Sequence, residues 1–300
     1  MLRDKSFVSR ADGPRIASME SAPDTRLKEL ILRFAQKLPT SPQIFSRLSM
    51  MLNDVNADLD KIANLISIDT GLTARVLRVS NSVFFRGSSP VQSLDEAINR
   101  VGFREIHKMV GMAMTEQIFM NGLPAYRMNA KQVWENSVAT ALAMESIANE
   151  AGHDAQAAYT LGILRQVGKL VLGRVLEKEQ PGAICPDDID VLSWESARLN
   201  ITNHEAAAYI LESWKLPRGM CSGIRFHQEP EEHDDDGPEG AQLHLAGWVV
   251  GQLGISTKSE SVLWELTQDR LDLAQVSENF MQSCVNNIQA ELDSLKAQMA

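Results

Sequence analysis

Apolar residues recur at helical spacing along most of this chain, and this repeat limits the fold more than any other feature of the sequence. One clear example is the set Leu59, Ile62, Ala63 and Ile66, which stand at positions i, i+3, i+4 and i+7. Similar short stretches follow one another through the first 120 residues, and the spacing returns as far as Ile288. The sequence therefore predicts an all-α fold made of many helices.

Residues that typically begin and end helices separate these stretches. Asp58 and Asp69 are predicted N-caps, because a short carboxylate can accept hydrogen bonds from the free N–H groups of a first turn. Ser93 and Glu96 form a capping-box pattern, and Gly102 is placed to close the helix that they begin. The first part of the chain is therefore expected to be a series of short helices.

Charge and composition disfavour several classes of function. The chain has 300 residues, a formal net charge of −10 and 44% apolar residues. An acidic surface opposes binding to phosphate backbones and to anionic membranes, so neither nucleic acid nor membrane is an expected partner. No apolar run is long enough for a membrane span or a signal peptide, which favours a cytoplasmic protein.

The three cysteines, Cys185, Cys221 and Cys284, are far apart and odd in number. In a cytoplasmic protein this pattern favours reduced thiols, and we expect them to be small residues of the core. Reactive or metal-binding roles are the alternative, but the close spacing of a cysteine metal site is missing.

The segment Leu161–Leu170 is predicted to be one buried helix, because its apolar residues share a face at helical spacing. Gly162 and Gly168 would allow a neighbouring helix to approach closely. Arg165 and Gln166 are adjacent polar residues in the middle of this apolar segment, which makes them candidates for a functional site.

Three motifs in fixed order resemble the HDOD family. They are Asp69–Thr73, Leu77–Ser82 and Ala97–Gly102, which match the family's Asp-Pro-x-Leu-Thr, Leu-Arg-x-x-Asn-Ser and Ala-Ile-x-x-Leu-Gly patterns at similar spacing. Thr70 stands where the family usually has Pro, and we expect little consequence, since Thr can occupy a first helical turn. Several ordered motifs are a far more specific signal than one short pattern.

The resemblance covers most of residues 27–255 and implies two packed helical subdomains, the second with a degenerate HD-like core. The turn residues Gly122–Pro124 mark the expected seam. The expected division is a flexible tail at 1–25, an N-terminal subdomain at 26–122, the HD-like subdomain at 123–256 and a C-terminal helical extension at 257–300.

Metal-dependent HD phosphohydrolases, which the second half resembles, use a histidine and an adjacent His-Asp pair as metal ligands. This chain has Asn136 in the first position and Arg165 with Gln166 in the pair. A carboxamide is a poor ligand for such metals, and a permanently cationic guanidinium would repel a divalent ion. We therefore expect no metal, no other cofactor and no catalytic residues.

His204 and His227 match later histidines of the HD framework by resemblance, and Thr202 with Glu205 forms a capping box that places His204 in a first turn. Three interpretations stay open. Both histidines can be buried hydrogen-bonding residues, they can retain a metal, or they can border a pocket in which Arg165 and Lys169 receive phosphate.

The HDOD motif residues are expected to have structural roles. Asn81 and Ser82 can satisfy backbone groups at a helix end or tie neighbouring helices together, with ligand binding as the alternative. Arg75 and Arg78 are expected to be solvated, although an acidic partner or a phosphate could use them. The acidic run at 229–239 is expected to be a solvated loop, because it lacks the ligand spacing of a calcium loop. The set of motif positions is Asp69, Leu72, Asn81, Ser82 and Gly102.

The resemblance implies a bacterial signal-transduction module that acts by protein–protein contacts, since the family has no common reaction. A sensor for cyclic di-GMP or guanosine polyphosphates, with phosphates near Arg165 and Lys169, is one alternative. Residual HD-type phosphohydrolase activity is another. A signalling protein is the expected partner, and its identity stays open. Whether the chain forms a homodimer stays open as well.

Overall fold

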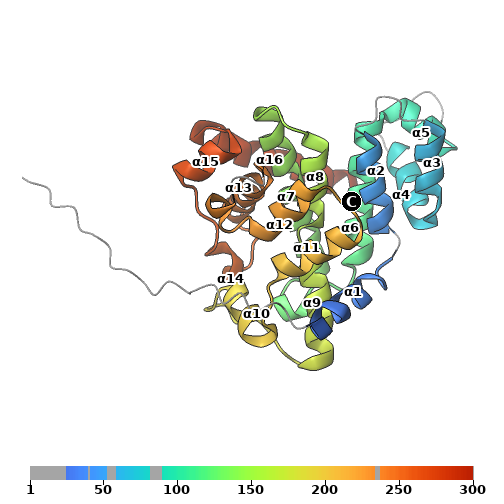
Figure 1. Ribbon diagram of the computed structural model, residues 1–300. Coiled ribbons are helices and arrows are strands. Elements are labelled where there is room, and N and C mark those ends of the chain that lie inside the picture. The colour runs from blue at the N-terminus through green and yellow to red at the C-terminus, as the bar shows by residue number, and fades with distance from the viewer. Residues whose placement is uncertain (1–24, 40, 53–58, 82–89, 234–236, 300) are drawn as a thin grey trace, which may run out of the picture.

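The computed structural model describes residues 25–39, 41–52, 59–81, 90–233 and 237–299, and Figure 1 shows them as helices joined by short connections. One isolated β-bridge joins Leu123 and Met128, and no strand occurs in these ranges. The predicted all-α fold is confirmed. The expected N-cap Asp58, Ser82 and nearly all of the N-terminal tail lie outside the described residues.

The helices are α1 Thr25–Ala35, α2 Ser41–Leu52, α3 Leu59–Ser67, α4 Thr70–Ser80, α5 Leu94–Val101, α6 Phe103–Ile118, η1 Pro124–Tyr126, α7 Ala130–Glu150, α8 Ala155–Leu164, α9 Val167–Glu179, α10 Val191–Leu199, α11 Asn203–Ser213, α12 Arg218–Phe226, η2 Pro230–Glu232, α13 Glu239–Gln252, α14 Lys258–Ser261, α15 Gln268–Ala274 and α16 Glu278–Met299.

Helices α2 to α6 form a group at one end of the molecule (Figure 1), in which α2 and α4 pack against α6. Asp69 caps α4 as predicted, with its carboxylate accepting hydrogen bonds from the N–H groups of Gly71 and Leu72. Ser93 caps α5 by accepting a hydrogen bond from the N–H of Glu96. The carboxylate of Glu96 accepts from the N–H of Gln92 and not from that of Ser93, so the return bond of the expected capping box goes to the residue before the cap.

The rest of the molecule surrounds α7, which packs against α6, α8, α13 and α16. A capping box of Asn129 and Gln132 begins this helix. Its middle is rich in alanine, and a Cβ added at Gly162 of α8 would come within 2.6 Å of the Cα of Ala141. The two helices therefore approach as closely as the glycine at 162 predicts.

Helix α1 packs against α9 and α11, far along the sequence, rather than within the group of α2 to α6. Its Arg26 lies 3.4 Å from the carboxylate of Glu179, and Lys28 lies over the ring of Tyr209. The helix that opens the expected N-terminal subdomain thus lies on the surface of the second group.

The prediction of one helix through Leu161–Leu170 is wrong, because α8 ends at Leu164 and α9 begins at Val167. Adjacent residues of a continuous helix point about 100° apart. Arg165 and Gln166 instead occupy a turn from which both side chains reach the same acceptor, Asn136. The close approach predicted at Gly168 is confirmed, since a Cβ there would lie 1.9 Å from the carbonyl oxygen of Asn203.

Candidate functional site

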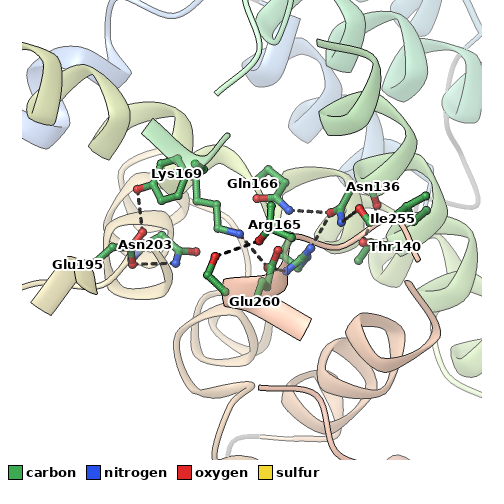
Figure 2. Close-up of polar contacts among 12 residues, drawn as sticks. Asn136, Thr140, Arg165, Gln166, Lys169, Glu195, Asn203, Ile255 and Glu260 are labelled. Carbon is green, nitrogen blue, oxygen red and sulfur yellow. Dashed lines mark hydrogen bonds and ion pairs between the residues drawn. The ribbon is translucent and has the colours of Figure 1, made fainter. Parts of the chain in front are cut away.

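Five separate parts of the fold bring the predicted pocket residues together, and Figure 2 shows those of the first three. Asn136 comes from α7, Arg165 with Gln166 from the α8–α9 turn, and Lys169 from the first turn of α9. The capping box of Thr202 and Glu205 places His204 in the first turn of α11, as predicted, and His227 is the C-cap of α12.

Asn136 joins two helices and a distant loop through its side-chain amide. Its Oδ1 accepts hydrogen bonds of 2.7 Å from both Arg165 Nη2 and Gln166 Nε2. Its Nδ2 donates to the carbonyl oxygen of Ile255 at 3.2 Å. The three residues that the resemblance to HD enzymes aligns with metal ligands are therefore joined through the Asn136 side chain.

Glu260 of α14 supplies the negative charge of the cluster. Its Oε1 accepts from Arg165 Nη1 at 2.5 Å and from Lys169 Nζ at 2.8 Å. All three side chains are buried, with 2% exposure for Arg165 and 1% for Lys169 and for Glu260. A phosphate therefore has no access to either cation while Glu260 is in place.

The pKa shifts follow from burial and from these neighbours. Burial alone would raise the pKa of Glu260, but the charges of Arg165 and Lys169 and their hydrogen bonds lower it to about 2. Burial and the charge of Arg165 lower the pKa of Lys169, against the opposing effect of Glu260. Because the carboxylate is ionised, the cluster is a salt bridge rather than a neutral pair.

His204 and His227 lie against each other, with ring centroids 4.0 Å apart. His227 Nδ1 is 2.8 Å from the carbonyl oxygen of Ile224, so Nδ1 donates the proton and Nε2 keeps a lone pair. Burial, reinforced by nearby positive charge, lowers the pKa of both imidazoles well below the usual value. Both are therefore neutral at physiological pH.

Trp264 packs beside the same cluster and was not among the predicted site residues. Its ring lies 5.3 Å from the guanidinium carbon of Arg165 and has its centroid 5.9 Å from that of His227. A Cβ added at Gly247 of α13 would meet the indole at 2.7 Å. The glycine thus makes room for the aromatic ring.

A second buried carboxylate, Glu195 of α10, lies on the far side of Lys169. Tyr126 donates its phenolic proton to Oε1 at 2.7 Å, and Asn203 donates from its backbone N–H and its side-chain amide to Oε2, at 2.7 and 2.9 Å. Burial raises the pKa of Glu195 to about 7, although these hydrogen bonds and the charge of Lys169 oppose the rise.

These donors do not suit a divalent metal. Two neutral imidazoles remain as possible ligands, whereas the carboxylate of Glu260 is already paired with Arg165 and Lys169. A metal cation bound here would be repelled by the positive charges of these two side chains. Across the part of the chain that the structure describes, no group of three or more His, Cys, Asp or Glu side chains is placed to hold a metal ion.

The HDOD motif residues lie in the N-terminal group, apart from the pocket. Asn81 Nδ2 donates to the carbonyl oxygens of Leu77 and Val91, and its Oδ1 accepts from Val91 N–H at 2.7 Å. These bonds tie the end of α4 to the segment before α5. Leu72 is buried in the core, and Gly102, with φ of 89°, serves both as the C-cap of α5 and as the N-cap of α6.

Other sequence predictions have mixed outcomes. Arg75 forms an ion pair with Glu116 of α6, while Arg78 is exposed. In the described part of the acidic run, Glu229, Glu231 and Glu232 are exposed, as expected of a solvated loop, and Glu231 also accepts a 2.6 Å hydrogen bond from Arg270 Nε. All three cysteines are free and buried.

Sequence reasoning missed Glu260, Trp264 and Glu195. Glu260 lies in a short polar segment that has no hydrophobic periodicity, so nothing local predicts its burial. A tryptophan four residues after it is the one signal that the segment returns to the core, because large aromatic side chains are seldom left in solvent.

The fold and the site define an all-helical protein whose buried centre holds an ion cluster made by the chain's own Arg165, Lys169 and Glu260. The HDOD domain model matches residues 38–230, and the chain belongs to the HDOD family.

Three solved structures share the fold. A protein of Marinobacter aquaeolei VT8, whose name proposes a role in signal transduction, has a TM-score of 0.68 and 20% identity, with 94% of this chain and 67% of that chain covered. A protein of Shewanella amazonensis SB2B, whose name proposes a phosphohydrolase, has a TM-score of 0.64 and 21% identity, with 90% of this chain and 98% of that chain covered. An HDOD domain protein of unknown function from Geobacter sulfurreducens has a TM-score of 0.62 and 20% identity, with 90% of this chain and 98% of that chain covered.

A curated relative from Treponema pallidum (strain Nichols), an uncharacterized protein, is 24% identical over 250 residues, or 78% of this chain. The match covers 46% of the relative, so the chain spans about half its length. Within the described residues, every helix is too short or too polar to cross a membrane.

Proposed function

We propose that this protein is a non-catalytic signal-transduction module that acts by binding a partner protein. The observation that carries the proposal is the salt bridge of Arg165 and Lys169 with Glu260, which fills the pocket at the positions where HD enzymes hold their metal. Without bound metal, water is not activated as a nucleophile. The name of the Marinobacter relative, with its reference to signal transduction, agrees with this function.

A groove between the two helical groups offers a docking surface for the partner. It has a volume of about 550 Å³ and lies between α4, α6 and α7. Met120 on its edge is 70% exposed, and Trp134 and Leu72 contribute to its wall. An exposed apolar side chain beside a hollow is typical of a protein-binding site, so the expected occupant is an apolar segment of a signalling protein.

Metal content and hydrolysis test the absence of catalysis. The full-length protein is purified without chelator, analysed for bound transition metals, and assayed with a chromogenic phosphodiester and with cyclic dinucleotides in the presence of Mn²⁺, Mg²⁺ or Zn²⁺. We expect no stoichiometric metal and no metal-stimulated hydrolysis. Hydrolysis that disappears in a His227→Ala variant would show that the pocket is catalytic.

A matched pair of surface variants tests the docking groove. Met120 and Ile68 are large apolar residues of similar exposure, 70% and 61%, and only Met120 borders the groove. A partner captured from the host is identified, purified and titrated against Met120→Glu and Ile68→Glu. We expect the charge at Met120 to weaken binding at least tenfold and the charge at Ile68 to leave it unchanged. Equal affinities would exclude the groove.

A further inference from the structure

The segment Ile255–Trp264 occupies the pocket through three separate contacts. The carbonyl oxygen of Ile255 accepts from Asn136, the carboxylate of Glu260 pairs with two cations, and the ring of Trp264 packs beside a guanidinium. This segment follows the part of the chain that matches the HDOD domain, which ends at residue 230. It therefore contacts the core from outside the matched range.

We propose that the pocket is a carboxylate-binding site and that Ile255–Trp264 is its internal ligand. The partner that takes its place carries the same chemistry, an acidic side chain followed four residues later by an aromatic one. This inference rests on the proposed function, because it gives the partner protein a second contact, through an acidic and an aromatic side chain, in addition to the apolar groove between α4, α6 and α7.

The acidic half of the ligand is bound through one oxygen. Glu260 Oε1 receives both Arg165 and Lys169, whereas Oε2 is buried and has no hydrogen-bond partner among the described residues. Arg165 Nε is likewise buried and unpartnered. A guanidinium can hold a carboxylate through two parallel hydrogen bonds, which are stronger and more specific. An incoming carboxylate that uses both oxygens would therefore bind better than the internal one.

The aromatic half of the ligand is held by shape. The indole of Trp264 packs so closely against Gly247 that a Cβ on this residue would not fit, and the ring faces Arg165 and His227. Trp264 Nε1 is buried and has no partner among the described atoms. Within the described ranges, the space that the Trp264 ring fills provides no hydrogen-bond partner for the indole N–H. An aromatic ring without an N–H therefore also suits it, so phenylalanine can replace tryptophan there.

The connection between the two anchors is exposed and short. Between Glu260 and Trp264 the chain has three residues, of which Ser261 and Val262 face solvent. Ser259 is buried, and Ile255 and Leu263 pack against the core, so the segment gives up these contacts as well when a partner displaces it.

Rescue by small anions tests the carboxylate site. In the full-length Glu260→Ala variant the melting temperature is measured with formate, acetate or inorganic phosphate, against chloride of equal ionic strength. We expect formate to raise it by roughly 3 °C, because a ligand of the folded state stabilises it by mass action. The matched control is Glu231→Ala, which removes one of the two carboxylate partners of Arg270 outside the pocket and should show no anion-specific rise.

A peptide tests the class of partner. A synthetic peptide with the sequence of residues 255–264 is titrated into the Glu260→Ala, Trp264→Ala double variant, together with versions that carry Gln for the Glu and Ala for the Trp. We expect the unmodified peptide to bind at least tenfold more tightly than either altered one. Equal affinities would overturn the proposed acidic and aromatic requirement.

Hydrogen exchange on the unaltered protein provides the test if the variants do not fold. Formate should speed amide exchange in residues 255–264 relative to chloride, with no change in α7, whereas unchanged exchange contradicts a displaceable ligand. Absence of rescue in a folded Glu260→Ala protein shows that the cluster is an ordinary salt bridge. Neither negative result bears on metal-dependent hydrolysis, so it leaves the proposed function standing.

Discussion

Acidification from pH 6.5 to pH 5.5 should destabilise this protein unusually strongly, because it buries four histidines as neutral groups. Burial is the main cause in each case. It lowers the pKa of His107 to about 3 and that of His244 to about 4, and lowers those of His204 and His227 well below the usual value. The unfolded chain binds protons at these groups near pH 6.5, so stability is full above that pH and falls below it.

The magnitude follows from proton linkage. A histidine that titrates near pH 6.5 only in the unfolded state lowers the free energy of unfolding by about 1 kcal/mol over this pH unit, so the four together lower it by about 4 kcal/mol. Glu195 acts in the opposite direction. Burial raises its folded-state pKa to about 7, so its protonation on acidification returns about 1 kcal/mol. The expected net loss is about 3 kcal/mol.

Guanidinium chloride denaturation, followed by circular dichroism at constant ionic strength, measures this loss directly. A Glu195→Gln variant is the matched test of sign, because it removes the opposing contribution and should increase the loss to about 4 kcal/mol. A net loss below about 1 kcal/mol in the unaltered protein would refute the neutral burial of these histidines.

Two further predictions concern packing and hydrogen bonding. Gly168→Ala should lower the free energy of unfolding by about 3 kcal/mol, because its Cβ would lie 1.9 Å from the carbonyl oxygen of Asn203. Gly173→Ala, where a Cβ has only an ordinary contact at 3.9 Å, should raise it by up to about 1 kcal/mol in the same denaturation assay. Asn81→Ala should cost about 2 kcal/mol, since it leaves N–H and carbonyl groups of Val91 without their partner, and hydrogen exchange should quicken there first.

Local chemistry was sufficient to predict several helix starts. The caps at Asp69 and Thr202 depend on a side chain and on backbone groups two or three residues away, and both occur as the sequence predicts. The turn at residues 165–166 was missed for a physical reason. The apolar positions before and after it are all buried, so periodicity continues across the turn and cannot reveal it.

The candidate site was only half predictable. Comparison of motif positions identified Asn136, Arg165 and Gln166, and the structure brings these three into direct contact. The counter-ion Glu260 lies 95 residues after Arg165 and has no pattern of its own. Which carboxylate neutralises a buried cation depends on the path of the chain in space, and that path is not encoded in any short window of sequence.

The position of Glu260 also decides where this protein can be cut. A fragment that ended with the family resemblance, at residue 230, would strand an arginine and a lysine in its interior without a counter-ion. The fragment that keeps these buried charges balanced therefore extends at least as far as Glu260, 30 residues past the end of the HDOD domain match.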